Sequence, residues 1–471
     1  MRSMKTVYPL VLAVCLTIAR AAMARATPEP ICPAQLSHEL AAVRQQANPW
    51  GHDREVWGIL VESLQGDRVF YRYNDRQYFI PASNAKILTT AAALTRLGPD
   101  YRIRTAIFGD ENRLRLVGRG DPSVTTAELQ NLAMQLRSSG IDRIDTAIVE
   151  DAYFGNAALN PHWEWEDVQA YYGAPANSLI FNENTIDITL HPQRLGEPLR
   201  VEWEDPDLAK RWQVVNTSVT VGPGEPEFVQ VGRDLHRPIL YVTGQLIAGS
   251  PPDPTGIAVA NPGDRFAEQF QKVLADAGIT VGEVEIATTA DPNPGPERAA
   301  IVSPIVAELV AEVNQTSNNL YAEVLLRTLG VIGIPHSNEP ADSRGLAVLK
   351  RTLADLGVDP QSYIVDDGSG LSRRNSVSPQ ALVQTLRAMA NSPHADVFFD
   401  SLPVREIDGQ AVGRGKGGTL TGVSSLSGYL DHPDYGTIVF SLIVNHATQP
   451  VGIQKETLRE MLRVLMRLQP C

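Results

Sequence analysis

Hydrophobic and polar positions predict a hairpin followed by a helix near the start of the chain. Apolar residues dominate 57–63 and 69–73, and the turn-forming residues Gln65, Gly66 and Asp67 lie between them. The next apolar segment, 83–97, is rich in Ala, Leu and Thr and is followed by Gly98-Pro99. This pattern predicts a largely buried helix with a sharp end.

The middle of the chain has a different pattern, with short alternating segments separated by Pro and Gly. These segments predict mostly strands, for example at 103–108, 114–117 and 185–190. The sequence Asp-Pro-Asn-Pro-Gly-Pro at 291–296 predicts a linker. Beyond it we expect helices at 304–313, 320–329 and 343–356, strands at 419–429 and 437–444, and an amphipathic helix at 453–468.

The length of 471 residues exceeds what one hydrophobic core usually fills, so more than one domain is expected. The simplest arrangement is one discontinuous α/β domain, made of 27–101 and 290–471, which is interrupted by inserted material at 102–289. The chain shows no internal repeat and no low-complexity tract.

The first 26 residues (1–26) have the pattern of a secretory signal. Arg2 and Lys5 precede an apolar run, and Ala24-Arg25-Ala26 offers a cleavage site between small residues. A lipoprotein site at Cys15 is the alternative. No later apolar stretch reaches the roughly 20 residues of a membrane span, so we expect an exported protein, periplasmic or associated with the cell wall, with at most peripheral membrane contact.

Charge and histidine spacing exclude several function classes. Removing the signal takes away four cations and no acid, so the net charge changes from -13 to about -17, which argues against a nucleic-acid partner. The nine histidines lack metal-ligand spacing, and neither a Gly-x-Ser-x-Gly nor a His-Glu-x-x-His motif occurs. We therefore expect no metal and no cofactor.

Two cysteines, Cys32 and Cys471, remain after removal of the signal. In an oxidising compartment they can form a disulfide that joins the two ends of the chain. Two unpaired thiols are the alternative, and the sequence leaves both open.

Two of the seven lysines lie in motifs that indicate chemistry. Lys86 follows Ser83 by three residues at the start of a predicted helix, which places hydroxyl and amine on one face, one turn apart. A nucleophile and its base need this geometry, and the positive end of the helix dipole favours negative charge at the serine oxygen. A solvated lysine on an exposed helix face is the alternative.

Two further motifs follow in order. Ser317-Asn318-Asn319 lies in the turn between two predicted helices, and Lys416-Gly417-Gly418-Thr419 precedes an apolar strand. Taken singly, each motif has an ordinary structural interpretation. Ser317 and Asn319 can be plain turn residues, and Lys416 can be a lysine that protects an edge strand from pairing with another chain.

The three motifs in this order, with their surroundings, resemble low-molecular-mass penicillin-binding proteins of the D-alanyl-D-alanine carboxypeptidase/endopeptidase type (class C). The resemblance covers about 56–444 and rests on segments 81–86, 97–101, 120–122, 317–323, 367–373 and 418–423. It includes the insertion, because 317 minus 83 leaves 234 positions between the first two motifs. It implies an α/β fold like that of serine β-lactamases and DD-peptidases, an antiparallel sheet flanked by helices and interrupted by a mixed, strand-rich insertion.

The resemblance also implies a mechanism. Ser83 would attack the carbonyl between two D-alanines to form an acyl-enzyme, and Lys86 would remove its proton. An amine with a pKa of about 10.4 is a poor base at neutral pH, so burial or a second cation such as Lys416 must lower that pKa. Ser317 would relay the proton to the leaving nitrogen.

The resemblance also implies three substrate-binding residues and an oxyanion hole. Asn319 would hydrogen-bond the substrate amide or hold Lys86, and Lys416 and Thr419 would bind the terminal carboxylate. The backbone N–H groups of Ser83 and Thr419 would form the oxyanion hole. The expected partners are peptidoglycan stem peptides and β-lactams.

The chain departs from the family in its third motif. Gly417 stands where threonine is usual, and the preceding segment 404–415 is short and rich in glycine, which predicts a loose strand. These departures favour the alternative function, a catalytically weakened or inactive peptidoglycan-binding relative of the same fold. Segment 366–372 forms either a tight loop or part of the site, and Asp121 is expected to form a turn.

Overall fold

The computed structural model describes residues 29–48, 54–155 and 158–471. The predicted export signal at 1–26 and the alternative site at Cys15 lie outside these residues. Within the described ranges, no helix has both the length and the apolar character needed to cross a membrane.

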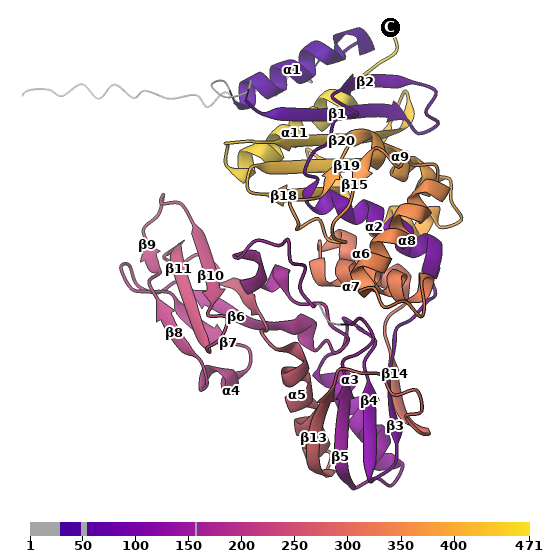
Figure 1. The fold of residues 1–471 in the computed structure, drawn as a ribbon. Helices are drawn as coiled ribbons and strands as arrows, with labels where there is room; N and C mark the ends of the chain where they lie inside the picture. Colours follow the sequence, from indigo (N-terminus) through magenta and orange to yellow (C-terminus); the bar gives the residue numbers. More distant parts are fainter. Residues whose placement is uncertain (1–28, 49–53, 156–157) are drawn as a thin grey trace, which may run out of the picture.

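A six-stranded antiparallel sheet lies at the centre of the larger part of the molecule (Figure 1). The strand order is β17-β18-β19-β20-β1-β2, so the first hairpin of the chain lies beside its last strand. The strands are β1 (Val56–Ser63), β2 (Val69–Tyr73), β17 (Val404–Ile407), β18 (Gln410–Leu420), β19 (Val423–His432) and β20 (Gly436–Asn445).

Two strand predictions for this sheet have different outcomes. The hairpin predicted from 57–63 and 69–73 is confirmed as β1 and β2. The single strand predicted over 419–429 is wrong, because the chain turns at Thr421-Gly422 between β18 and β19. Gly422 has a φ of 73°, which glycine adopts without steric cost.

Helices cover both faces of the sheet. Alternate residues of β1 point to opposite faces, so Leu60 packs in the core with α2, and Ile59 and Val61 pack in the core with α1 and α11. One face carries α1 (Leu36–Ala47) and α11 (Val451–Met466). The other carries α2 (Ala85–Leu97), α6 (Val306–Gln315), α7 (Asn319–Gly333), α8 (Ala341–Asp355), α9 (Pro379–Ala390) and α10 (Ala395–Ser401). The helices expected at 304–313, 320–329, 343–356 and 453–468 are thus confirmed as α6, α7, α8 and α11.

The inserted material builds a second, five-stranded mixed sheet in the order β13-β5-β4-β3-β14, packed against two helices. Its elements are β3 (Arg104–Gly109), β4 (Arg113–Val117), α3 (Thr126–Ser138), β5 (Arg143–Glu150), α5 (Pro262–Asp276), β13 (Thr280–Ala287) and β14 (Glu297–Val302). Because β14 pairs with β3, segment 291–296 connects two strands of one sheet and does not separate domains. We propose that the insertion extends to Val302, beyond the expected end at 289.

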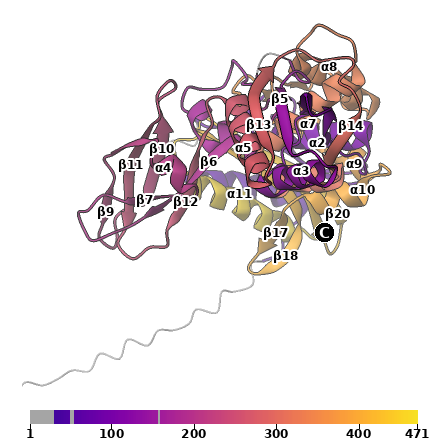
Figure 2. The same ribbon diagram turned by 90° about the horizontal axis from the view of Figure 1, so that it is seen from below.

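The rest of the insertion contains two smaller sheets. These two sheets extend away from the six-stranded sheet in both views (Figures 1 and 2). Their elements are β6 (Thr185–His191), β7 (Arg200–Trp203), α4 (Pro206–Ala209), β8 (Gln213–Asn216), β9 (Val219–Val221), β10 (Phe228–Arg233), β11 (Ile239–Ile247) and β12 (Asp253–Ala258). The short elements of the chain are β15 (Tyr363–Ile364), β16 (Ser376–Val377) and the 3₁₀ turns η1 (Pro33–Gln35), η2 (Ala82–Asn84), η3 (Asp167–Gln169), η4 (Tyr171–Gly173) and η5 (Asn182–Asn184).

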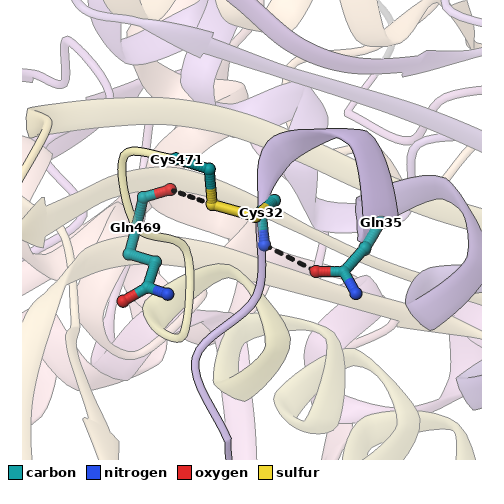
Figure 3. Close-up of a disulfide and its surroundings, with 4 residues drawn as sticks. All are labelled: Cys32, Gln35, Gln469 and Cys471. Atoms are coloured by element: carbon teal, nitrogen blue, oxygen red, sulfur yellow. Dashed lines mark hydrogen bonds between the residues drawn. A yellow bond between two sulfur atoms is a disulfide. The ribbon is translucent and has the colours of Figure 1, made fainter.

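A disulfide joins Cys32 to Cys471 (Figure 3). The two residues are 439 positions apart in sequence, and their Cα atoms lie 5.8 Å apart. Next to it, the Ile31 amide donates to the Arg467 carbonyl and the Gln469 amide donates to the Ile31 carbonyl. Of the two alternatives that the sequence left open, the structure contains the bonded form.

Candidate active site

Ser83 lies in η2, a single 3₁₀ turn that leads into α2. The sequence placed it in the first turn of the helix itself, but the helix begins at Ala85. The turn is anchored to the central sheet, because the buried Asn84 side chain donates to Ser427 Oγ at 2.9 Å. The preceding Ile80 amide donates to the Asn445 side chain at 2.8 Å. These contacts position the Ser83 hydroxyl from a rigid support.

Lys86 is fully buried one turn beyond Ser83. Its Nζ donates to Ser83 Oγ at 3.1 Å, to Asn319 Oδ1 at 2.5 Å and to the Ser369 carbonyl at 2.6 Å. Burial lowers the pKa of Lys86 to about 7, against the opposing effect of Asp367 and Glu323. An amine with this pKa can accept the serine proton at neutral pH.

Lys416 projects from β18 and is nearly as deeply buried as Lys86, with 3% of its surface exposed. Its Nζ donates to Ser317 Oγ at 2.8 Å and to the Gly417 carbonyl at 3.0 Å. Burial, with smaller contributions from Lys86 and Arg405, lowers the pKa of Lys416 to about 6. Burial is thus the main cause of the low pKa of both lysines, and repulsion between the two cations adds to it.

Gly418 allows β18 to lie directly against the Ser83 turn. A Cβ atom there would lie 2.8 Å from the Ser83 backbone nitrogen and 2.9 Å from the Pro81 carbonyl oxygen. The neighbouring Thr419 lines the same cavities as Ser83. The loose strand predicted for this glycine-rich segment is wrong, because β18 is continuous over eleven residues and pairs with β17 and β19.

Segment 366–372 is both a tight loop and part of the site, so both alternatives hold. Asp367 accepts hydrogen bonds from the amides of Gly370 (2.8 Å) and Ser372 (2.7 Å). The same carboxylate accepts the indole N–H of Trp163 at 2.9 Å. The loop thereby presents the Ser369 carbonyl to Lys86.

Glu323 is a site residue that the sequence reasoning missed. Its Oε1 accepts the amides of Gly368 (2.9 Å) and Ser369 (2.8 Å), and its side chain is buried. Burial, with a smaller contribution from Asp367, raises the pKa of Glu323 to about 7. The available signal was its position four residues after Asn319, which puts both side chains on one face of α7.

The insertion reaches the site at the second motif. Asn319 Nδ2 donates to the Tyr172 carbonyl at 2.7 Å, and Asn318 Nδ2 donates to Glu183 Oε2 at 2.8 Å. The insertion therefore positions the same asparagine that accepts from Lys86. Elsewhere in the insertion, Asp121 accepts the Ser123 amide at 2.9 Å, which is the turn expected there.

Two cavities meet at Ser83, Ser317 and Thr419. The larger, of about 1130 Å³, extends towards the insertion and is lined there by Tyr171 and Tyr172. The smaller, of about 880 Å³, extends along the β17–β18 hairpin and α11. In the described part of the chain, no three metal-binding side chains come together.

The structure thus brings together the six candidate site residues, namely Ser83, Lys86, Ser317, Asn319, Lys416 and Thr419. A hydroxyl beside a buried amine of low pKa, in an open groove, can attack a carbonyl and form an ester.

Known proteins share extensive sequence similarity with this chain. The sequence model of the D-Ala-D-Ala carboxypeptidase 3 (S13) family matches residues 36–465. A D-alanyl-D-alanine carboxypeptidase of Actinomadura sp. (strain R39) is 29% identical over 429 residues, which cover 84% of this chain and 78% of that protein.

Solved structures show the same fold. Penicillin binding protein 4 (dacB) from Haemophilus influenzae matches with a TM-score of 0.75 and 21% identity, over 91% of this chain and 99% of that one. Its complex with a novel β-lactam matches with a TM-score of 0.70, the same identity and the same coverage. The predicted α/β fold, an antiparallel sheet flanked by helices with a strand-rich insertion, is confirmed.

Proposed function

Because this chain belongs to the D-Ala-D-Ala carboxypeptidase (S13) family and is a serine-type hydrolase, we propose that it cleaves D-alanyl-D-alanine through an acyl-enzyme on Ser83. The proposed substrates are the stem peptides of peptidoglycan. The observation that carries the proposal is the 3.1 Å contact between Lys86 Nζ and Ser83 Oγ, with burial lowering the pKa of the amine to about 7.

The first half of the reaction forms the ester. Neutral Lys86 takes the Ser83 proton while Oγ attacks the carbonyl carbon of the penultimate D-alanine. The backbone N–H groups of Ser83 and Thr419 hold the oxyanion, a contribution worth about 10²- to 10³-fold in rate per donor. When the intermediate collapses, the C–N bond breaks and the leaving nitrogen must gain a proton.

Ser317 is the proposed relay for that proton. The proton that Lys86 took from Ser83 passes to the leaving nitrogen through the Ser317 hydroxyl, which leaves Lys86 neutral again, and Lys416 Nζ holds this hydroxyl by a hydrogen bond of 2.8 Å. Water then attacks the ester carbonyl with Lys86 again as base, and Ser83 is released. The low pKa of Lys86 supports its taking and returning a proton in each half of the reaction.

Recognition of the substrate's end is assigned to the smaller cavity. Lys416 and Thr419 line it beside Ser83 and are the proposed carboxylate-binding residues. Asn319 lines the larger cavity, where the acyl side of the peptide is proposed to bind. Grooves that leave Ser83 in two directions also suit a crosslinked substrate, so we propose endopeptidase activity in addition.

Covalent binding of β-lactams follows from the same chemistry, because opening of the lactam ring by Ser83 leaves an ester. The solved β-lactam complex of the Haemophilus protein supports this proposal. We further propose that the protein acts outside the cytoplasm, where peptidoglycan lies, as the pattern at 1–26 indicates.

The competing proposal is a peptidoglycan-binding relative that no longer cuts its ligand. Gly417 favours it, since the hydroxyl usual at this position is missing. Intact-mass spectrometry with and without benzylpenicillin distinguishes the two proposals. Acylation by penicillin requires a working nucleophile but does not require efficient turnover.

We expect an increase of one penicillin mass in the parent protein and none in Ser83→Ala. Ser343→Ala, at an exposed position on α8, is the matched control and should acylate normally. An adduct that persists in Ser83→Ala would contradict the assignment of the nucleophile. A folded parent protein that forms no adduct and cleaves no D-Ala-D-Ala peptide would favour the binding relative.

A further inference from the structure

Basic side chains outnumber acidic ones around the smaller cavity, although the protein as a whole is acidic. Arg405 from β17, Lys416 from β18 and Lys455 from α11 all line it. In the described part of the chain, none of these three side chains forms an ion pair. Two other cations of the same wall, Arg459 and Arg463, do pair with carboxylates of α11.

Arg405 is held in place with part of its guanidinium unused. Nε and Nη2 both donate to the Gly415 carbonyl, at 2.8 and 2.5 Å. Among the described residues, Nη1 has no hydrogen-bond acceptor. A half-buried guanidinium without a carboxylate partner is costly, so a bound anion would stabilise it. An arginine fixed at one edge and open at the other suits a carboxylate, which accepts two hydrogen bonds.

The open guanidinium lies beside the position where the chain departs from its family. A Cβ atom at Gly417 would lie 3.8 Å from Arg405 Nη2, which is ordinary contact distance. The side chain missing at 417 would therefore have occupied space next to Arg405. Gly417 and Arg405 line the same cavity as Ser83 and Lys416.

We infer that Arg405 binds the carboxylate of the leaving group and replaces the hydroxyl that is absent at Gly417. The ligand class is a peptide end with a free carboxylate next to the scissile bond. This inference rests on the proposed function and makes Arg405 a specificity residue, because it would favour free chain ends over blocked ones.

The test compares two reactive substrates that differ only in this group. N-acyl-D-alanyl thioesters are prepared with mercaptoacetate or with mercaptoacetamide as the leaving group, and kcat/KM is measured for each. In Arg405→Gln we expect about a tenfold or larger loss with the acid and little change with the amide, since hydrogen bonds to charged groups are the strong ones. Arg72→Gln, on β2 at the opposite edge of the sheet, is the matched control and should leave both rates unchanged.

Rescue distinguishes binding from support of the strand. Gly417→Thr has room for its side chain, so in the Arg405→Gln background it should restore part of the rate with the acid alone. Equal losses with both substrates would mean that Arg405 only holds the Gly415 carbonyl, and the inference would fail. If Arg405→Gln does not fold, Arg405→Lys replaces it in the test. The inference then requires a smaller loss of kcat/KM with the acid substrate and little change with the amide.

Failure of the proposed function would look different. In that case the parent protein would hydrolyse neither thioester and would form no penicillin adduct. A parent protein that hydrolyses both thioesters, with an Arg405→Gln variant that still prefers the acid as strongly, would overturn this inference alone.

Discussion

Glu323 and Lys86 both hydrogen-bond the backbone of Ser369, Glu323 at its amide and Lys86 at its carbonyl. The Ser369 amide donates to Glu323 Oε1 at 2.8 Å, and its carbonyl accepts from Lys86 Nζ at 2.6 Å. Glu323 thus positions the Ser369 carbonyl oxygen, which in turn orients Lys86, the proposed base. It does so without a direct contact between the Glu323 carboxylate and the Lys86 amine.

Two replacements of Glu323 should distinguish the effect of its charge from the effect of its hydrogen bonds. Glu323→Gln keeps an acceptor for the Gly368 and Ser369 amides, whereas Glu323→Ala leaves two buried amides unsatisfied at a cost of about 1–3 kcal/mol each. We expect Glu323→Ala to lose most of its penicillin acylation rate and Glu323→Gln to keep much of it. Equal rates in both variants and the parent would contradict a positioning role.

Acylation should rise with pH through the pKa of Lys86. The base acts in its neutral form, and burial lowers its pKa to about 7, so the rate should increase from acidic pH and level off at about 8. The negative charge of Glu323 raises the pKa of Lys86. Glu323→Gln removes this charge, so the midpoint of the rise should move to lower pH. Stopped-flow acylation between about pH 5 and 9 measures both. A rate still rising at pH 9 would mean that the base has an ordinary lysine pKa.

Gly370→Ala should disturb the nucleophile's turn. A Cβ atom at Gly370 would lie 1.9 Å from the Ala82 carbonyl oxygen, next to Ser83, and the φ of Gly370 is 85°. We expect a large loss of acylation together with a lower thermal unfolding midpoint. Gly357→Ala is the matched control, because its φ is 83° and nothing lies within 4 Å of the added atom. If both variants behave alike, backbone strain and not the clash is responsible.

Loss of the disulfide should lower stability without changing the chemistry. Cys32 and Cys471 lie by the core of α1 and α11, on the opposite face of the sheet from α2. We expect Cys32→Ala/Cys471→Ala to lower the free energy of unfolding by about 2–4 kcal/mol in denaturant. The penicillin acylation rate of the native variant should equal that of the parent. A reduced acylation rate would show that the bond also supports the site.

The sequence by itself determined the local features of this protein. The Ser83–Lys86 pair follows from three-residue spacing along one turn, and the hairpin of β1 and β2 follows from alternation around a glycine turn. The motif order also indicated the family, and Gly417 showed where the chain departs from it. These features could be predicted because each depends on neighbouring residues.

Tertiary structure alone decided what surrounds these residues. Sequence spacing did not reveal that Glu323 holds the amides of Gly368 and Ser369, which lie about 45 residues further along the chain, or that Arg405 lies beside Gly417 in the smaller cavity. The pairing of β14 with β3 likewise overrode the proline-rich linker pattern. The physical reason is that burial and hydrogen bonding at a site sum over all elements that pack there. Sequence spacing reports only the contacts made within one element.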